Sequence, residues 1–562
     1  APGTDTTPAD HRETHTLIKK ATLLVILFVA ATTLGADPEL ITRAERKDFA
    51  ETSLYADVIN FVNSAVSRSP KLRAGAFGAS AGGLDLPLVV VSAEGIATPE
   101  EARLYDLPVV LLAANIHAGE VEGKEALQIL LRDVVEGALD EVILNQVLLV
   151  VPIFNADGND KLGDNRGDDG PELAGIRYNG QNLDLNRDFI KLDTPEVRAL
   201  IQLIRSWNPV LYVDMHTTNG SLHREPVTYT TMANENCSET LKQYMWEEFF
   251  PGVSATLKET YGIHSIPYGN FDDRTQPTKG WSNHAFEARY STNYVGLRNI
   301  FTVLDENYSH ADFKTRVLSS HAFVRSIIEY THNHIGEMRQ LLVDEAVRTR
   351  EGLVQHGWIT AFDVGKLQDI TIESYEFETR RIPENELENY PPWLNGVLVE
   401  KTDVLKDYTV PYFNRTVATA TIDLPEAYVI PNACGETIEN LQAHGIIIER
   451  IEREIPATVE RFLIEEVATA DRPNQGRVTL DIRGDWVSEK TSLEAGSFMV
   501  PMRQPLARLI PVLLEPDGAD SLARWGFFSS WIVPQWSRGF NPYPVLRLNE
   551  IPDGIRMRTY TP

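Results

Sequence analysis

Five short apolar runs alternate with amphipathic stretches along the chain. Each run is continuous and rich in Val, Ile and Leu, which is typical of strands buried on both faces of a sheet. The stretches between them repeat apolar residues at helical spacing. The runs are LPLVVVSA (86–93), LPVVLLAAN (107–115), NQVLLVVPIFN (145–155), NPVLYVDMH (208–216) and RNIFTVLDEN (298–307).

The intervening stretches predict helices over residues 120–137 and 194–207. In the second helix, Thr194 is placed to cap the N-terminus, and Pro195 occupies the first helical position, where its missing N–H is not needed. Residues 37–80 are predicted to be a helical lead-in. Strands that alternate with helices indicate an α/β domain with a largely parallel or mixed sheet.

The pattern changes after a long helix that is predicted to end near residue 352. KLQDITIESYEFET and RTVATATIDLPEAYVIP alternate apolar and polar residues in the manner of strands, and TIENLQAHG predicts a short helix closed by Gly445. We therefore predict three parts: an N-terminal extension with a signal peptide (1–36), a catalytic domain (37–352) and a smaller β-rich C-terminal module (353–562).

The segment IKKATLLVILFVAATTLGA (18–36) has the pattern of a secretory signal. Two lysines precede a short apolar run, and small residues follow it. The run falls short of the ~20 residues that cross a membrane, so we expect a secreted or periplasmic protein. The alternative is an uncleaved single-helix anchor, which would be the chain's one link to a membrane.

Charge and cysteine content narrow the classes of function. A net charge of −28 argues against nucleic acid as a partner, because binding phosphates needs clustered Lys and Arg. The chain has two cysteines, Cys237 and Cys434. An exported protein can join them in a disulfide, but two unpaired thiols in separate domains fit the sequence equally well.

Four residues with metal or acid–base chemistry fall at the ends of predicted strands. His117 and Glu120 follow the strand at 107–115, His216 closes the strand at 208–216, and Glu306 closes the last run. In open α/β sheets, ligands bind beyond the carboxyl ends of the strands, so we expect these side chains to meet there.

Two histidines and one carboxylate, with a fourth position left to water, form a common catalytic zinc site. A separate carboxylate, which we assign to Glu306, can then take a proton from the water and pass it to a leaving amine. Taken alone, a His-x-x-Glu pair is more often a polar loop feature. A second such pair, His284 and Glu287, does not follow an apolar run, and we assign it to a helix face or loop.

The stretch GIRYNGQNLDLNRDF (175–189) adds two arginines and an asparagine. A guanidinium fork matches a substrate carboxylate, and a second arginine near a metal can stabilise an oxyanion. The alternative is surface ion pairing of Arg177 and Arg187 with Asp184 and Asp188.

Four blocks together give the chain a family resemblance. HAGE, NLDLNRDF, DMHTT and LDENYSHADFKTRV, in this order within residues 109–316, resemble the zinc carboxypeptidases of the carboxypeptidase A type. The resemblance implies an α/β/α sandwich around a mixed, mostly parallel eight-stranded sheet. It also implies one zinc ion held by His117, Glu120 and His216, with Glu306 as the general base and acid.

The same resemblance implies how a substrate is held. Asn186 and Arg187 would grip the free C-terminal carboxylate of a peptide, and Arg177 would polarise the carbonyl of the bond to be cleaved. The family's substrate-capping tyrosine matches Tyr290 or Tyr294, and we choose Tyr294. Residues 353–562 resemble the accessory C-terminal part of bacterial exported members, and we predict a structural role for them.

The sequence therefore predicts an exported zinc metallocarboxypeptidase that hydrolyses the C-terminal amide bond of peptides. A related alternative is a zinc amidase that acts on cell-wall peptides or N-acyl amino acids. An alternative of another class is a catalytically inactive binding protein on the same scaffold.

Overall fold

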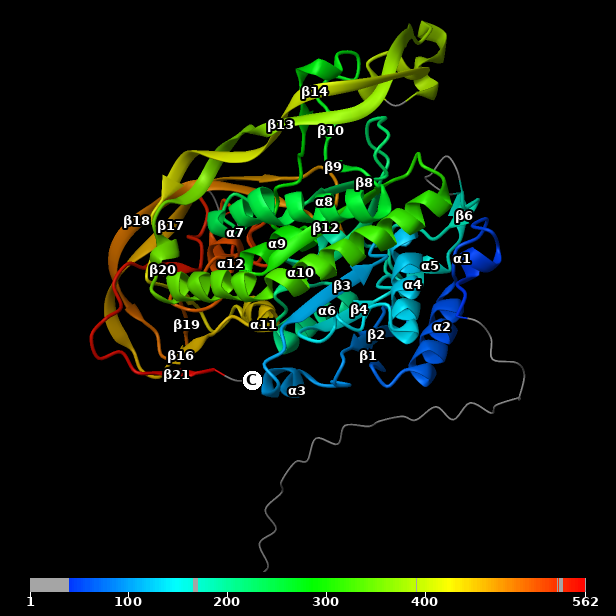
Figure 1. Ribbon diagram of the computed structural model, residues 1–562. Coiled ribbons are helices and arrows are strands. Elements are labelled where there is room, and N and C mark those ends of the chain that lie inside the picture. Colours follow the sequence, from blue (N-terminus) through cyan, green and yellow to red (C-terminus); the bar gives the residue numbers. More distant parts are fainter. Residues whose placement is uncertain (1–39, 165–169, 391, 533, 535–538, 561–562) are drawn as a thin grey trace, which may run out of the picture. The chain divides into compact units, whose positions relative to one another are not determined.

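A mixed eight-stranded sheet forms the centre of the fold in this computed structural model (Figure 1). The structure describes residues 40–164, 170–390, 392–532, 534 and 539–560. Four of the seven strand pairings in this sheet are parallel, which confirms the mostly parallel sheet predicted. In spatial order the strands are β1 (Leu72–Ala79), β2 (Asp85–Val91), β4 (Val147–Val151), β3 (Val109–Ala114), β7 (Leu211–Thr218), β12 (Phe301–Tyr308), β8 (Val227–Thr230) and β9 (Ser265–Pro267).

All five apolar runs form strands of this sheet, namely β2, β3, β4, β7 and β12. Every residue of β3, β4 and β7 is buried, because helices cover both faces. On one side α4 packs against α2 and α10, and on the other α6 packs against β1 and α11. The helices of this part are α1 (Arg43–Arg46), α2 (Tyr55–Arg68), α3 (Pro99–Leu104), α4 (Glu122–Glu136), α5 (Ala156–Asn159), α6 (Pro195–Trp207), α7 (Glu239–Tyr244), α8 (Phe250–Tyr261), α9 (Ser291–Leu297) and α10 (Phe313–Arg350).

The N-terminal cap of α6 is formed as predicted. The Thr194 hydroxyl oxygen accepts a hydrogen bond from the backbone N–H of Val197 at 3.4 Å, and Pro195 is the first helical residue. The prediction of a helical lead-in is wrong for its last part, because residues 72–79 form the edge strand β1, antiparallel to β2. Its sequence LRAGAFGA is poor in strand-forming residues, and backbone pairing with β2 decides its conformation.

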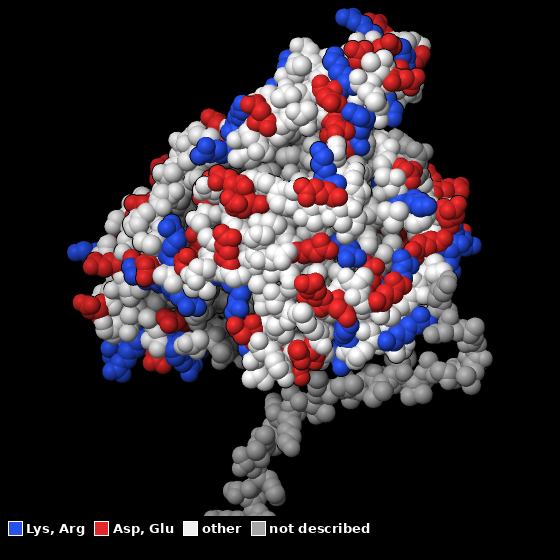
Figure 2. Space-filling model, viewed as in Figure 1, with Lys and Arg blue, Asp and Glu red and all other residues white. Residues whose placement is uncertain are grey.

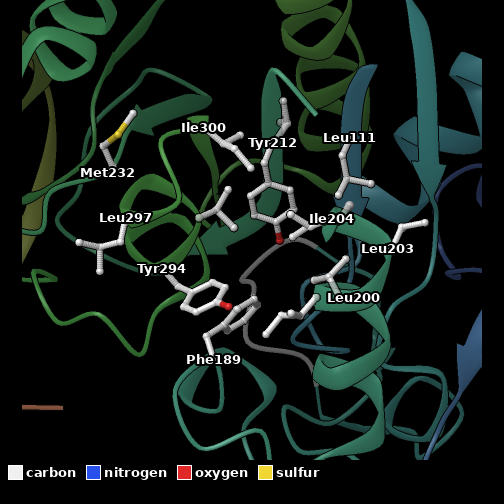
Figure 3. Close-up of a cluster of buried hydrophobic side chains, with 14 of the residues drawn as sticks. Leu111, Phe189, Leu200, Leu203, Ile204, Tyr212, Met232, Tyr294, Leu297 and Ile300 are labelled. Atoms are coloured by element: carbon white, nitrogen blue, oxygen red, sulfur yellow. The ribbon is translucent and has the colours of Figure 1, made fainter. Parts of the chain in front are cut away.

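A core between the sheet and its helices anchors the chain around Asn186 and Arg187 (Figure 3). Phe189 packs against Tyr294 of α9, with ring centroids 5.6 Å apart. Each large apolar side chain buried in this way stabilises the fold by about 1.5–3 kcal/mol. Around these two rings lie buried side chains of β3, β7 and α6, including Leu111, Tyr212, Leu200, Leu203 and Ile204.

The part beyond residue 352 is β-rich, as predicted. Two long strands, β13 (Trp358–Arg381) and β14 (Val397–Ile422), form an antiparallel hairpin. β14 also pairs with β11 (Trp281–Ser282), which pairs with β10 (Asn270–Phe271), so the hairpin shares a sheet with the preceding part of the chain.

A separate seven-stranded sheet follows this hairpin in the chain. Gly445, with φ of 88°, closes its helix α11, as predicted. Residues 40–562 form one compact unit, and the division at residue 352 stays a prediction. The remaining elements are β5 (Gly163–Asp164), β6 (Leu173–Ala174), β15 (Ala427–Ile430), α11 (Gly435–His444), β16 (Glu449–Ile451), β17 (Ile455–Thr469), β18 (Leu480–Leu493), β19 (Phe498–Pro501), α12 (Leu509–Leu514), β20 (Leu546–Leu548) and β21 (Met557–Thr559).

Four sequence predictions concern the signal segment, membrane spanning, the cysteines and the charge. The expected signal segment, 18–36, lies outside the described residues. Within the described ranges, no helix has the length and apolar character needed to cross a membrane. Cys237 and Cys434 are both buried and unbridged. Figure 2 shows acidic side chains interspersed with basic ones over the face it displays.

Candidate metal centre

The three predicted metal ligands meet at the carboxyl ends of adjacent strands. His117 and Glu120 lie on the turn after β3, and His216 lies in β7, the next strand of the sheet. One ligand atom from each lies within 4.8 Å of the others, and all three residues are buried. The Glu120 carboxylate faces both rings, with its oxygens 3.1 Å from His117 Nδ1 and 2.9 Å from His216 Nδ1.

Glycines allow the turn that carries these ligands to pack closely against a second loop. A Cβ on Gly119 would lie 2.8 Å from the carbonyl oxygen of Gly175, and a Cβ on Gly175 would lie 2.7 Å from the carbonyl oxygen of Ala118. Since a contact this short excludes a side chain, two glycines bring the loop of Arg177 beside the turn of His117.

Two aspartates that the sequence prediction did not include lie beside the histidine rings. His117 Nε2 lies 3.0 Å from Asp184 Oδ1, and His216 Nε2 lies 3.0 Å from Asp214 Oδ2. A carboxylate beside Nε2 favours protonation of that nitrogen. The lone pair of Nδ1 then points toward the space between the three candidate metal ligands. Asp214 could have been found from its place two residues before His216, because alternate strand residues share a face.

The charges of this group compensate one another. Burial opposes ionisation of Glu120, but the two facing histidines lower the pKa of its carboxyl well below the usual range. Burial likewise opposes protonation of His216, but Asp214 and Glu120 raise the pKa of its ring. Two imidazoles and one carboxylate, directed inward and supported by carboxylates behind them, are the donor set of a catalytic zinc site.

Arg177 lies beside the ligands. Its Nε donates to Asp184 Oδ2 at 2.8 Å, and its Nη1 lies 3.2 Å from His117 Nδ1 and 3.6 Å from Glu120 Oε1. Burial opposes its charge, but Asp184 and Glu120 raise the pKa of the guanidinium. A fixed positive charge therefore adjoins the metal ligands.

These groups open into one cavity of about 340 Å³. Glu306 lines it, and in the parallel pairing of β12 with β7 it is the register partner of His216. The cavity brings together the metal ligands and four more predicted site residues, Glu306, Arg177, Asn186 and Arg187.

The predicted capping tyrosine, Tyr294, does not line this cavity. Its side chain has 0% exposure, and its hydroxyl lies 2.8 Å from His444 Nδ1 in the core. Tyr290, just before α9, lines the cavity instead, and the Arg187 guanidinium lies 4.3 Å from its ring centroid. The α9 helix turns Tyr294 inward, a direction that sequence spacing does not give.

Two other side chains that line the cavity are those of Tyr268 and His284. Tyr268, which the sequence reasoning missed, lines it, and burial together with the charge of Glu306 raises the pKa of its hydroxyl. His284 also lines the cavity, whereas Glu287 accepts a hydrogen bond from Arg289 Nη2 at 2.8 Å. This second His-x-x-Glu pair does not join the metal group.

Comparison with known proteins agrees with this arrangement. Residues 58–293 match the family model described as zinc carboxypeptidase. This part of the chain is similar to the zinc carboxypeptidase family. The match and the names of the curated relatives indicate a hydrolase of peptide bonds. The matched range includes the three metal-ligand candidates and Arg187, and Glu306 lies beyond its end.

The similarity to whole carboxypeptidases reaches further along the chain. Carboxypeptidase 2 of Trichophyton equinum is 24% identical over 485 residues, covering 83% of this chain and 81% of that protein. Carboxypeptidase 2 of Trichophyton rubrum is 22% identical over 474 residues, covering 81% and 79%. Among solved structures, carboxypeptidase A of Helicoverpa armigera matches 51% of this chain and 75% of its own, with 12% identity and a TM-score of 0.37.

The C-terminal part of the protein contacts the loops of the cavity. Gln475 Oε1 accepts a hydrogen bond from the Asp184 backbone N–H at 2.8 Å. Asn440 Nδ2 donates to the carbonyl oxygen of Lys191 at 2.9 Å, and His444 Nε2 lies 3.1 Å from that of Ile190. The module that we predicted to be structural therefore holds the segment around Asn186 and Arg187.

Proposed function

We propose that this protein is an exported zinc carboxypeptidase that removes the C-terminal residue of peptides. One observation carries the proposal: a buried His–Glu–His group, the carboxylate of Glu306 and the guanidinium of Arg187 line the same cavity. The signal-like segment 18–36 supports export.

His117, Glu120 and His216 would hold the zinc ion, since two imidazoles and one carboxylate fit it and leave a position open. When bound, zinc supplies a Lewis acid that lowers the pKa of a water ligand to about 7 and polarises a carbonyl. Asp184 and Asp214 keep the two rings in the tautomer that binds metal.

Glu306 is the proposed general base and acid. Its position beside His216 in the strand register places its carboxylate on the cavity, next to the metal ligands. A carboxylate there takes a proton from the attacking water and returns it to the nitrogen of the leaving amino acid. Arg177, fixed by Asp184, stabilises the negative charge that develops on the carbonyl oxygen.

Asn186 and Arg187 are the proposed anchors for the substrate's terminal carboxylate. Asn186 Oδ1 accepts a hydrogen bond from the Ser291 backbone N–H at 2.8 Å, which couples this anchor to the start of α9. Arg187 presents a planar fork suited to a carboxylate. We propose Tyr290 in place of Tyr294 as the capping residue, because Tyr290 stacks on Arg187 and lines the cavity.

The test is a matched pair of peptides that differ only in a free or an amidated C-terminus. A carboxypeptidase releases one residue from the free peptide and loses most of its activity on the amide, because Arg187 then lacks its partner. Mass spectrometry of the products, with and without a chelator, measures both the reaction and its metal requirement. Equal cleavage of the two peptides would contradict the proposal and favour an amidase.

A further inference from the structure

A second cavity, of about 510 Å³, adjoins the metal cavity. The two share Asn219 and Asn270 among their lining residues. Neither the proposed carboxylate anchors, Asn186 and Arg187, nor the proposed capping residue, Tyr290, lines the second cavity. A ligand held at Arg187 can therefore continue into this space past the metal ligands.

The walls of the second cavity are largely apolar and come from separate parts of the chain. Leu222 follows β7, Phe271 lies in β10, and Phe377 and Val399 lie in the β13–β14 hairpin (Figure 1). Phe377 and Val399 project from the same face of the hairpin, because Val399 pairs with Thr379, two residues from Phe377. The rings of Phe271 and Phe377 are 6.3 Å apart.

Hydrogen bonds fix these walls relative to one another. The Ser221 backbone N–H donates to Asn270 Oδ1 at 2.8 Å, and the Phe271 N–H donates to Ser221 Oγ at 3.0 Å. On the hairpin side, Ser374 Oγ donates to the carbonyl oxygen of Leu222 at 2.7 Å. The loop, β10 and the hairpin thus form a preorganised space.

We propose that the second cavity binds the substrate residues that precede the cleaved bond and selects apolar side chains there. This inference rests on the proposed function, which sets the direction of the peptide: its carboxylate lies at Arg187 and its preceding residues leave past Asn219 and Asn270. Amide side chains at that boundary can bond both peptide N–H and C=O groups.

The length and charge of the preferred substrate follow from this placement. One residue of extended chain spans about 3.3–3.6 Å, so a dipeptide ends near the metal cavity and a longer peptide reaches the apolar walls. Among the residues that line the second cavity, Arg274 carries a formal positive charge. This charge repels a lysine side chain in the upstream positions of the substrate.

The experiment compares a blocked dipeptide with two hexapeptides that share its last two residues. One hexapeptide carries Leu and Phe upstream, and the other carries Lys at the same positions. We expect the apolar hexapeptide to have a kcat/KM about tenfold or more above that of the lysine peptide. Phe377→Ala should remove about tenfold of the apolar peptide's kcat/KM, through KM, and leave dipeptide turnover unchanged.

Leu405→Ala, at an exposed position of the same hairpin, is the matched control and should change neither substrate. Dipeptide turnover also reports whether each variant is folded. An equal loss on dipeptide and hexapeptide, or no loss on either, would overturn the proposal. If the wild-type protein cleaves neither, the proposed function fails. In that case, calorimetry measures the Kd of the apolar hexapeptide for the Glu306→Gln variant and for the double variant Glu306→Gln/Phe377→Ala, which tests binding to the second cavity alone. The same Kd for both variants would refute the proposed cavity.

Discussion

Asp520 accepts two hydrogen bonds from Arg289, one from its backbone N–H and one from its Nη1, both at 2.9 Å. Arg289 immediately precedes Tyr290, the tyrosine that stacks on Arg187. Asp520 is buried, with an exposure of 4%, and lies 231 residues further along the chain. A residue of the C-terminal part thus fixes the segment that carries the proposed capping residue.

Asp520→Ala should therefore weaken substrate binding more than it slows the chemical step. Removing one partner of a buried hydrogen-bonded pair costs roughly 1–3 kcal/mol, and here it releases the Tyr290 segment. We expect KM for a peptide with a free C-terminus to rise about tenfold, with kcat changed by less than about threefold. In a Tyr290→Ala background, the same substitution should add little to KM, because the two residues act through one segment. If Asp520→Ala raised KM by the same factor in the Tyr290→Ala background as in the wild type, Asp520 would act through a segment other than that of Tyr290.

Glu306→Gln should lower kcat by about 100-fold or more, the usual effect of removing a general base. The neutral amide keeps the shape of the side chain but cannot take a proton, so zinc content should stay near one ion per chain. Steady-state kinetics and metal analysis of the same preparation check both results. Glu239→Gln, in the exposed first turn of α7, is the matched control. Unchanged turnover in Glu306→Gln would assign the base to another residue.

Asp214→Asn should weaken zinc binding by about 10–100-fold, since it removes the carboxylate that orients His216. A zinc titration against a competing chelator measures this without any assay of activity.

Dialysis of the wild-type protein against a strong chelator should abolish peptide hydrolysis, and added zinc should restore it. Full hydrolysis by protein shown to contain no metal would contradict the proposed mechanism.

Tyr290 and Tyr294 should respond differently to substitution. Tyr290→Ala should raise KM for free-carboxylate peptides by about tenfold, because the ring lines the cavity beside Arg187. Tyr294→Phe should leave KM unchanged and lower the free energy of unfolding by about 1–2 kcal/mol, because it leaves His444 without its hydroxyl partner in the core. Kinetics and denaturant unfolding separate the two effects. The reverse outcome would restore Tyr294 as the capping residue.

His444 should make the protein less stable in mild acid. Burial lowers the pKa of its ring from 6.5 to about 3. Below pH 6.5 the unfolded chain binds a proton that the folded chain excludes, so stability falls as pH decreases, by about 1.4 kcal/mol per unit. Between neutral pH and pH 5 this amounts to about 2 kcal/mol.

The His444→Asn variant isolates this contribution from that of other acidic and basic groups. The difference in unfolding free energy between the wild type and the variant, measured in urea from pH 7.5 to 4.5, should shrink by about 1.4 kcal/mol per unit below pH 6.5. A difference independent of pH would mean that His444 titrates normally in the folded protein.

The sequence by itself predicted the elements whose pattern is local. The runs that became β2, β3, β4, β7 and β12 were visible because strands buried on both faces are continuously apolar. His117, Glu120 and His216 could be predicted as one group for a related reason: each follows or ends such a strand, and parallel strands deliver their carboxyl ends to one edge of the sheet.

Tertiary structure alone decided that Asp184 supports His117 and which tyrosine faces the cavity. The pairing of β1 with β2 turned part of a predicted helical segment into a strand, and the packing of α9 on Phe189 turned Tyr294 inward. The contact of Asp520 with Arg289 joins positions 231 residues apart. No local pattern encodes such contacts, because they arise from burial and hydrogen bonding between segments that meet only once the chain has folded.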